Sequence, residues 1–247
     1  DGVKILAGAD YYALLDGKAG KPVRIGVKGK KEDIVIKPIS SGELEELLYK
    51  RWVDRNRALV DSISGGRIAY VHVKAMDSES FRKVYEELLS ESNRNRDAVV
   101  VDERHNGGGW LHDDLCTLLA GKEYQQFVPR DKYIGRDPYN KWTKPSCVLI
   151  CEDDYSNGHG FPWVYKELGI GKLIGAPVAG TMTAVWWETL MDRSLVFGIP
   201  QVGCRDMRGV YGENTTLHPD IEVYNTPEDY INGYDRQLER AVREMMK

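Results

Sequence analysis

Strongly apolar segments alternate with amphipathic ones through the middle of this sequence, and that alternation restricts the fold more than any other feature. The apolar segments are typical of strands buried on both faces: "RIAYVHV" (67–73), "DAVVVDE" (97–103), "SCVLICE" (146–152) and "KLIG" (172–175). The segments between them have helical spacing: 78–92, 111–121 and 161–169. This order predicts an α/β fold, with a mainly parallel sheet and flanking helices.

The sequence before this region has a different pattern. Residues 41–64 place leucines and valines at helical spacing after a serine cap, which predicts one long amphipathic helix. The first residues predict a strand at 3–6, a helix at 9–18 and strands at 22–27 and 33–39. Residues 1–38 form too small a piece to bury much surface alone, so we expect them to be the end of a longer domain.

After Ala184 the pattern favours strands again, and the chain closes on a helix. The strands are predicted at 184–191, 194–200 and 221–224, and the helix at 234–247. The acidic and basic residues are interspersed, with a net charge of −4 and no basic run, so nucleic acid is not an expected partner. No segment approaches the roughly 20 apolar residues of a membrane span.

The sequence gives no sign of a metal or an organic cofactor. The four cysteines are too scattered for a disulfide framework, and Cys147 and Cys151 lie in an apolar strand, where a free, buried thiol is expected. The histidines show no zinc-ligand spacing: His72, His105, His112, His159 and His218. The first residues show no signal peptide, and the compartment stays open between cytoplasm and periplasm.

Two polar loops follow predicted strands, where the carboxyl ends of parallel strands gather functional groups. The first, "DERHNGGGW" (102–110), has three glycines whose amides could hold an oxyanion. The second, "EDDYSNGHG" (152–160), places Ser156 between a strand and a helix expected to start near Gly160. The residues alone leave two interpretations of Ser156 open, a nucleophile or an ordinary turn residue, because the residues of "YSNG" are also favoured in turns.

A set of motifs in a fixed order favours the first reading. The motifs are "GRIAYVHV", "VVVDERHNGGGW", "ICEDDYSNGHGFPWVYKELGIGKLIG", "GAPVAGTMTAV" and "YGENTTLHPDIEV". Together they resemble the catalytic core of tail-specific and tricorn-type serine peptidases of family S41. The resemblance implies a ClpP/crotonase-like α/β spiral at 67–247, preceded by a connecting helix at 39–66 and by the C-terminal part of a PDZ-like domain at 1–38.

The resemblance also implies site residues. Carboxy-terminal processing peptidases of this family use a lysine as general base, but the matching position here is Thr181, which cannot deprotonate a serine. Tricorn-type peptidases use a serine, a histidine and a glutamate, and Ser156 and Glu213 match two of these. Their histidine comes from a domain upstream of the PDZ domain, so it is expected outside this chain. His159 is the local alternative.

The expected reaction is hydrolysis of short or unfolded peptides through an acyl-enzyme on Ser156. The amides of Asn157 and of Gly107 or Gly108 would hold the oxyanion, and Glu213 would support the histidine. The expected partners are peptide substrates and upstream domains of the same polypeptide, with a homo-oligomer left open. Two alternatives remain: a non-catalytic peptide-binding module, and another crotonase-fold enzyme that stabilises an enolate.

Overall fold

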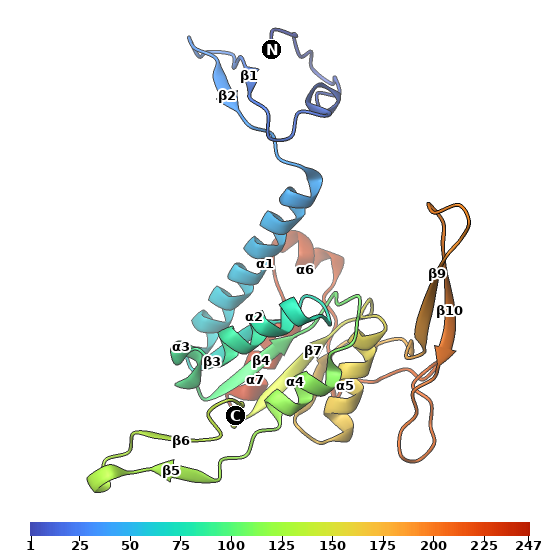
Figure 1. Ribbon diagram of the computed structural model, residues 1–247. Helices are drawn as coiled ribbons and strands as arrows, with labels where there is room; N and C mark the ends of the chain where they lie inside the picture. The colour runs from blue at the N-terminus through green and yellow to red at the C-terminus, as the bar shows by residue number, and fades with distance from the viewer. The chain divides into compact units, whose positions relative to one another are not determined.

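The computed structural model describes residues 1–247, which divide into two compact units, Asp1–Arg55 and Asn56–Lys247 (Figure 1). Helix α1 (Ser41–Ser64) contains the boundary between them and matches the predicted helix. Its start is fixed by a capping box, in which the Glu43 amide donates to Ser40 Oγ (3.2 Å) and the Ser40 amide donates to the Glu43 carboxylate (2.8 Å). None of the helices combines the length and apolar character needed to cross a membrane.

The first unit has less regular structure than predicted. Strand β1 (Val23–Ile25) pairs antiparallel with β2 (Ile34–Ile36), as expected. The predicted strand at 3–6 is wrong, because this segment is exposed and pairs with no other strand. The predicted helix at 9–18 is only a 3₁₀ turn, η1 (Tyr12–Leu15). Asp16 leaves the helical region immediately after it, and so short a helix gains too few hydrogen bonds to extend.

The second unit is built on a five-stranded parallel sheet with the strand order β11-β8-β7-β4-β3. This confirms the predicted α/β fold and its parallel sheet. Residues at one level of three neighbouring strands lie side by side: His72 in β3, Asp102 in β4 and Leu149 in β7. The strands are β3 (Ile68–His72), β4 (Ala98–Asp102), β7 (Ser146–Ile150), β8 (Lys172–Gly175) and β11 (Ile221–Glu222).

Helices cover both faces of this sheet, which explains why the strands are apolar throughout. Helices α2, α4 and α5 lie on one face (Figure 1). Their side chains share a buried core with Val71, Val101 and Val148. On the other, α7 packs against β4, β7 and β8. The helices are α2 (Ser78–Leu88), α3 (Glu91–Arg94), α4 (His112–Leu119), α5 (Asn157–Glu167), α6 (Pro227–Asn232) and α7 (Arg236–Met245).

Two antiparallel hairpins complete the second unit. Strands β9 (Ala184–Thr189) and β10 (Val196–Val202) were expected from the sequence. Strands β5 (Gln125–Phe127) and β6 (Gly135–Asp137), with the 3₁₀ turn η2 (Pro129–Asp131) between them, were not. Each strand of this second hairpin has three residues and no buried face, so no alternation of apolar and polar residues marks it.

A buried charge network fastens α7 to the sheet. Arg104 donates to both carboxylate oxygens of Asp102 (2.9 and 2.7 Å), to Asp235 (3.0 Å) and to Gln237 (3.1 Å). Burial acts to raise the pKa of Asp102, but the charge and hydrogen bonds of Arg104 outweigh it, and the pKa is lowered. The Asp102 carboxylate therefore stays ionised inside the protein.

Replacing Arg104 should destabilise the fold strongly. Arg104→Leu leaves the Asp102 charge buried without its partner, and we expect a loss of about 3–5 kcal/mol in the free energy of unfolding, measured by urea denaturation at pH 7. The loss should shrink as the pH falls below ~3.9, where the unfolded Asp102 carboxylate also takes up a proton. Arg243→Leu, which breaks an exposed ion pair with Glu239 on α7, is the control. Equal losses in the two variants would contradict this role.

Candidate active site

The loops that follow β4 and β7 are held together by the backbone and side chain of one residue. Asn106 is fully buried and makes four hydrogen bonds. Its amide donates to Asp154 Oδ1 (3.2 Å) and its carbonyl accepts from the Tyr155 amide (2.9 Å). Its side chain donates to the Val73 carbonyl (2.9 Å) and accepts from the Gly108 amide (2.8 Å). The two loops predicted to carry chemistry are therefore held at fixed positions beside each other.

Ser156 lies at the N-cap position of α5, but its side chain does not cap the helix. It directly precedes α5, which begins at Asn157 rather than near Gly160, and its hydroxyl makes no capping hydrogen bond. Its φ of 55° and ψ of −117° are unusual for a residue with a side chain, and such strain is concentrated at functional turns. The Ser156 amide donates to Thr181 Oγ1 (3.1 Å). The residue at the position of the family's lysine thus lies beside Ser156, and here it is a threonine.

The glycine loop approaches Ser156 so closely that only glycine fits. Gly108 has a φ of +93°, and a Cβ on it would lie 2.7 Å from the Ser156 Cβ and 2.9 Å from the Asn157 nitrogen. The Gly108 amide is already engaged with Asn106 (2.8 Å). The amides of Gly107 and Asn157 donate no hydrogen bond within the chain. Of the two glycines expected to help hold an oxyanion, Gly107 has the available donor.

The Asn157 side chain fixes the start of α5 against the start of α4. Its oxygen accepts from the amides of Leu111 (2.7 Å) and His112 (3.1 Å), and its Nδ2 donates to His112 Nδ1 (2.9 Å). His112, at the start of α4, is therefore half-buried and hydrogen-bonded. Because Asn157 is held at three points, its backbone amide beside Ser156 has little freedom to move.

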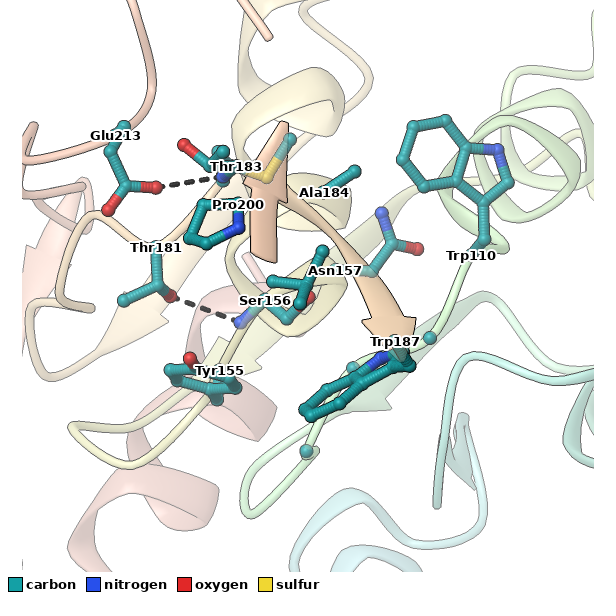
Figure 2. A pocket seen from close by; sticks show the side chains of 15 residues that line it. Trp110, Tyr155, Ser156, Asn157, Thr181, Thr183, Ala184, Trp187, Pro200 and Glu213 are labelled. Atoms are coloured by element: carbon teal, nitrogen blue, oxygen red, sulfur yellow. Dashed lines mark hydrogen bonds between the residues drawn. The ribbon is translucent and has the colours of Figure 1, made fainter. Parts of the chain in front are cut away.

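A cavity of about 680 Å³ opens above Ser156 (Figure 2). Glu213 and Thr181 lie on one side of Ser156 and Trp110 on the other. The lining includes Trp187 of β9, but no histidine and no lysine. The remaining lining residues are 107–109, Tyr155, Asn157, 182–185 and Pro200. The cavity thus combines a hydroxyl, backbone amides and one carboxylate between aromatic walls.

Glu213 is held as a carboxylate at the cavity. Its Oε2 accepts from the Thr183 amide (2.8 Å). Hydrogen bonds from Thr183, the side-chain one first, lower the pKa of Glu213, and the neighbouring His159 acts in the same direction. The sequence placed Glu213 through the family resemblance, whereas nothing in the sequence predicted Thr183 as its partner.

The histidines of the chain lie away from the Ser156 hydroxyl. His159 is buried, stacks on Trp163 and has no hydrogen-bond partner for Nδ1. Burial lowers the pKa of His159, against the effect of the Glu213 charge. Its backbone amide donates to the Ser156 carbonyl (2.9 Å), but its imidazole makes no hydrogen bond to Ser156 and does not line the cavity. His72 is a buried strand residue, as expected, and His218 is exposed outside the lining. The structure therefore does not bring a local base to Ser156.

Two buried acids beneath the loops were missed by the sequence analysis. Asp154 accepts from the Cys151 amide (2.8 Å) and the Asn106 amide (3.2 Å), and burial raises its pKa to about 8 despite these hydrogen bonds. Glu103 is fully buried with no partner for either carboxylate oxygen, and burial raises its pKa well above the usual range. In the sequence, these two acids appear only as members of a run of charged residues after each strand. Such runs are usually exposed, so their burial was not predicted.

Comparisons with known proteins agree with this geometry. The chain is 29% identical to the tricorn protease of Thermoplasma acidophilum over 98% of its own length and 23% of that protein. It is 31% identical to a putative tricorn-like protease C-terminal subunit of Sulfurisphaera tokodaii, over 89% of this chain and 25% of that protein. The chain thus spans about a quarter of the length of these relatives.

Solved structures show the same fold. The crystal structure of the tricorn protease matches 100% of this chain and 24% of its own, with a TM-score of 0.85 and 28% identity. Mature CPAF matches 72% of this chain and 51% of its own, with a TM-score of 0.54 and 16% identity, which concerns the fold alone. A sequence model described as Peptidase family S41 matches residues 67–223, more than half of the chain. The chain therefore belongs to peptidase family S41.

Proposed function

We propose that this chain carries the nucleophile and oxyanion site of a serine peptidase, with Ser156 as the nucleophile. The observation that carries the proposal is the strained turn at Ser156, which leaves the hydroxyl without a capping role at the floor of the cavity. The available amides of Asn157 and Gly107 lie in the two loops that meet there. A hydroxyl beside preorganised amide donors is the arrangement that acyl transfer requires.

In the proposed reaction, Ser156 Oγ attacks the carbonyl carbon of a peptide bond as a histidine takes its proton. The Asn157 and Gly107 amides stabilise the oxyanion, and the histidine returns its proton to the leaving amine. Water then hydrolyses the acyl-enzyme. Glu213, whose pKa the hydrogen bonds of Thr183 lower further below neutral pH, would stabilise the histidinium. This histidine is proposed to come from an upstream domain of the same polypeptide, since the cavity lining contains none.

The substrate is proposed to be an extended peptide, short or unfolded. Strand β9 pairs only with β10, so one of its edges has unpaired backbone groups. Ala184, Val185 and Trp187 of β9 line the cavity. A peptide could therefore add to this edge as a further strand, with its scissile bond over Ser156.

A non-catalytic peptide-binding module is the second candidate. The lack of any histidine or lysine in the lining favours it, because the same cavity without a base would bind a peptide but not cleave it. The two candidates differ in whether Ser156 ever reacts.

Covalent labelling of Ser156 separates the candidates. A fluorophosphonate probe should label Ser156 slowly or not at all in this chain, and rapidly when a longer polypeptide supplies the proposed upstream histidine. The adduct is located by peptide mass spectrometry, with Ser156→Ala as the control. Rapid labelling of the chain alone would place the base within these residues. If neither this chain nor the longer polypeptide is labelled, the peptidase proposal is contradicted and the binding module is favoured.

Removing the Glu213 charge should slow the reaction without unfolding the protein. In the polypeptide that carries the proposed histidine, Glu213→Gln keeps the shape of the side chain but removes the charge that stabilises the histidinium. We expect kcat/KM for a peptide substrate to fall about a hundredfold. Glu222→Gln, in the exposed end of β11, is the control and should retain the wild-type rate. A Glu213→Gln enzyme of full activity would rule out this role.

The close approach of Gly108 gives a third test. In the polypeptide that carries the proposed histidine, Gly108→Ala should slow the labelling of Ser156 about a hundredfold, because the new Cβ would push the two loops apart and misplace the hydroxyl. Gly107→Ala keeps its amide hydrogen and meets no atom within 4 Å, so it should retain most of the rate. Similar rates for the two variants would show that the loop contact does not position Ser156.

A further inference from the structure

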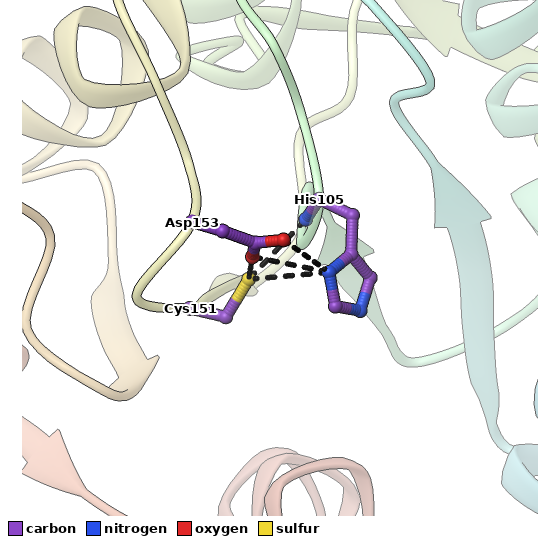
Figure 3. Close-up of side chains that lie close together, drawn as sticks. All are labelled: His105, Cys151 and Asp153. Carbon is purple, nitrogen blue, oxygen red and sulfur yellow. Dashed lines mark hydrogen bonds and ion pairs between the residues drawn. The ribbon is translucent and has the colours of Figure 1, made fainter.

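Three side chains of metal-binding type meet behind the two active-site loops. His105 follows β4, and Cys151 and Asp153 follow β7 (Figure 3). His105 Nδ1 lies 3.1 and 3.0 Å from the two carboxylate oxygens of Asp153. Cys151 Sγ lies 2.7 Å from Asp153 Oδ1 and 3.9 Å from His105 Nδ1. One imidazole nitrogen, one sulfur and one carboxylate oxygen thus lie within 4.8 Å of one another.

We propose that His105 Nδ1, Cys151 Sγ and an Asp153 carboxylate oxygen bind a Zn²⁺ ion, with water as the fourth ligand. Nitrogen, thiolate sulfur and carboxylate oxygen are the three ligand types that zinc accepts. In a tetrahedral zinc site such atoms lie about 3.3–3.6 Å apart. The separations here, 2.7 to 3.9 Å, bracket that range. Reaching it requires movements below about 1 Å, within the range of side-chain rotation.

The surroundings of the cluster suit a thiolate ligand. Cys151 is buried, and its sulfur accepts a hydrogen bond from the His105 backbone amide (3.2 Å), which would stabilise a negative sulfur and orient it. The side chains of His105 and Asp153 are 53% and 66% exposed, so an ion can reach the sulfur from solvent. The cluster therefore has one anchored ligand inside and two accessible ligands outside.

Binding exchanges a proton for the metal. Without an ion the Cys151 thiol donates to Asp153, and burial, aided by Asp154, raises the pKa of the Cys151 thiol. When Zn²⁺ binds, the S–H bond breaks, the S–Zn bond forms and the proton leaves to solvent. No electron is transferred, so the step needs no oxidant or reductant.

The site is separate from the proposed catalytic cavity but acts on the same loops. None of the three ligands lines that cavity. His105 precedes Gly108 by three residues, and Asp153 precedes Ser156 by three. A bound ion would join the two loops directly and add to the hydrogen bonds of Asn106. The proposal does not depend on whether Ser156 is catalytic.

The test is metal binding to the folded protein, with Co²⁺ as a spectroscopic probe and Zn²⁺ as the ligand. Co²⁺ should give the intense visible bands of a four-coordinate site and a sulfur-to-metal charge-transfer band, and Zn²⁺ should abolish both. Zn²⁺ at about a hundred times its Kd should raise the Tm by about 5 °C. Mg²⁺, which prefers six oxygen ligands, should change neither signal.

Each ligand has a matched control. Cys151→Ser, His105→Ala and Asp153→Asn should each weaken Zn²⁺ binding about a hundredfold. Cys204→Ser, His218→Ala and Glu152→Gln remove a thiol, an imidazole and a carboxylate outside the cluster and should bind as wild type. His105 and Asp153 are exposed, so their variants should fold even if Cys151→Ser does not. Equal binding by ligand and control variants, or no Tm shift in wild type, would overturn the proposal.

Discussion

The relative position of the glycine loop and the Ser156 loop depends on the four hydrogen bonds of Asn106. This side chain and its backbone connect the end of β3, the glycine loop and the Ser156 loop, and no solvent reaches it. Its side-chain amide holds the glycine loop to the end of β3, and its backbone N–H and C=O hold that loop to the Ser156 loop. If the loops separated, buried polar groups of Asn106 would lose their hydrogen-bond partners. Because an unpaired buried polar group has a large desolvation cost, the loops stay together.

This network also explains how the site tolerates strain. Ser156 has a φ of 55°, which is costly for a residue with a side chain, whereas Gly108 adopts its positive φ without strain. The Asn157 side chain, with its bonds to Leu111 and His112, restrains the same region from the side of the helices. Strain of this kind persists only where the surroundings determine the backbone more strongly than local preference does.

Much of the fold was predictable, because buried parallel strands and amphipathic helices leave strong patterns. The strand at 98–102 and the helix at 41–64 follow directly from such patterns. The segment at 3–6 was mispredicted because an apolar run says nothing about whether a pairing strand exists. In the site, the roles of Ser156, Thr181 and Glu213 came from resemblance to a family. The roles of Asn106 and Thr183 could not be predicted, since their partners are backbone atoms or residues distant in sequence.

The cluster of His105, Cys151 and Asp153 could not be predicted either, because its members are distant in sequence. Its histidine and cysteine are 46 residues apart, so no short ligand spacing appears in the sequence. They meet because β4 and β7 are hydrogen-bonded parallel neighbours whose carboxyl ends lie at one edge of the sheet. A motif search finds residues that are close in the sequence, whereas these three residues are brought together by the order of the strands in the sheet.

The unpaired edge of β9 limits the length of any peptide chain that can pair with it. The strand has six residues, and at ~3.4 Å per residue its edge is about 20 Å long. Successive backbone groups of a strand point to opposite edges, so only about every second residue of β9 faces outward with both its N–H and its C=O. An added chain would therefore be held at about three of six positions. The register of such a chain would shift in steps of two residues, which keeps the same side chains facing the protein.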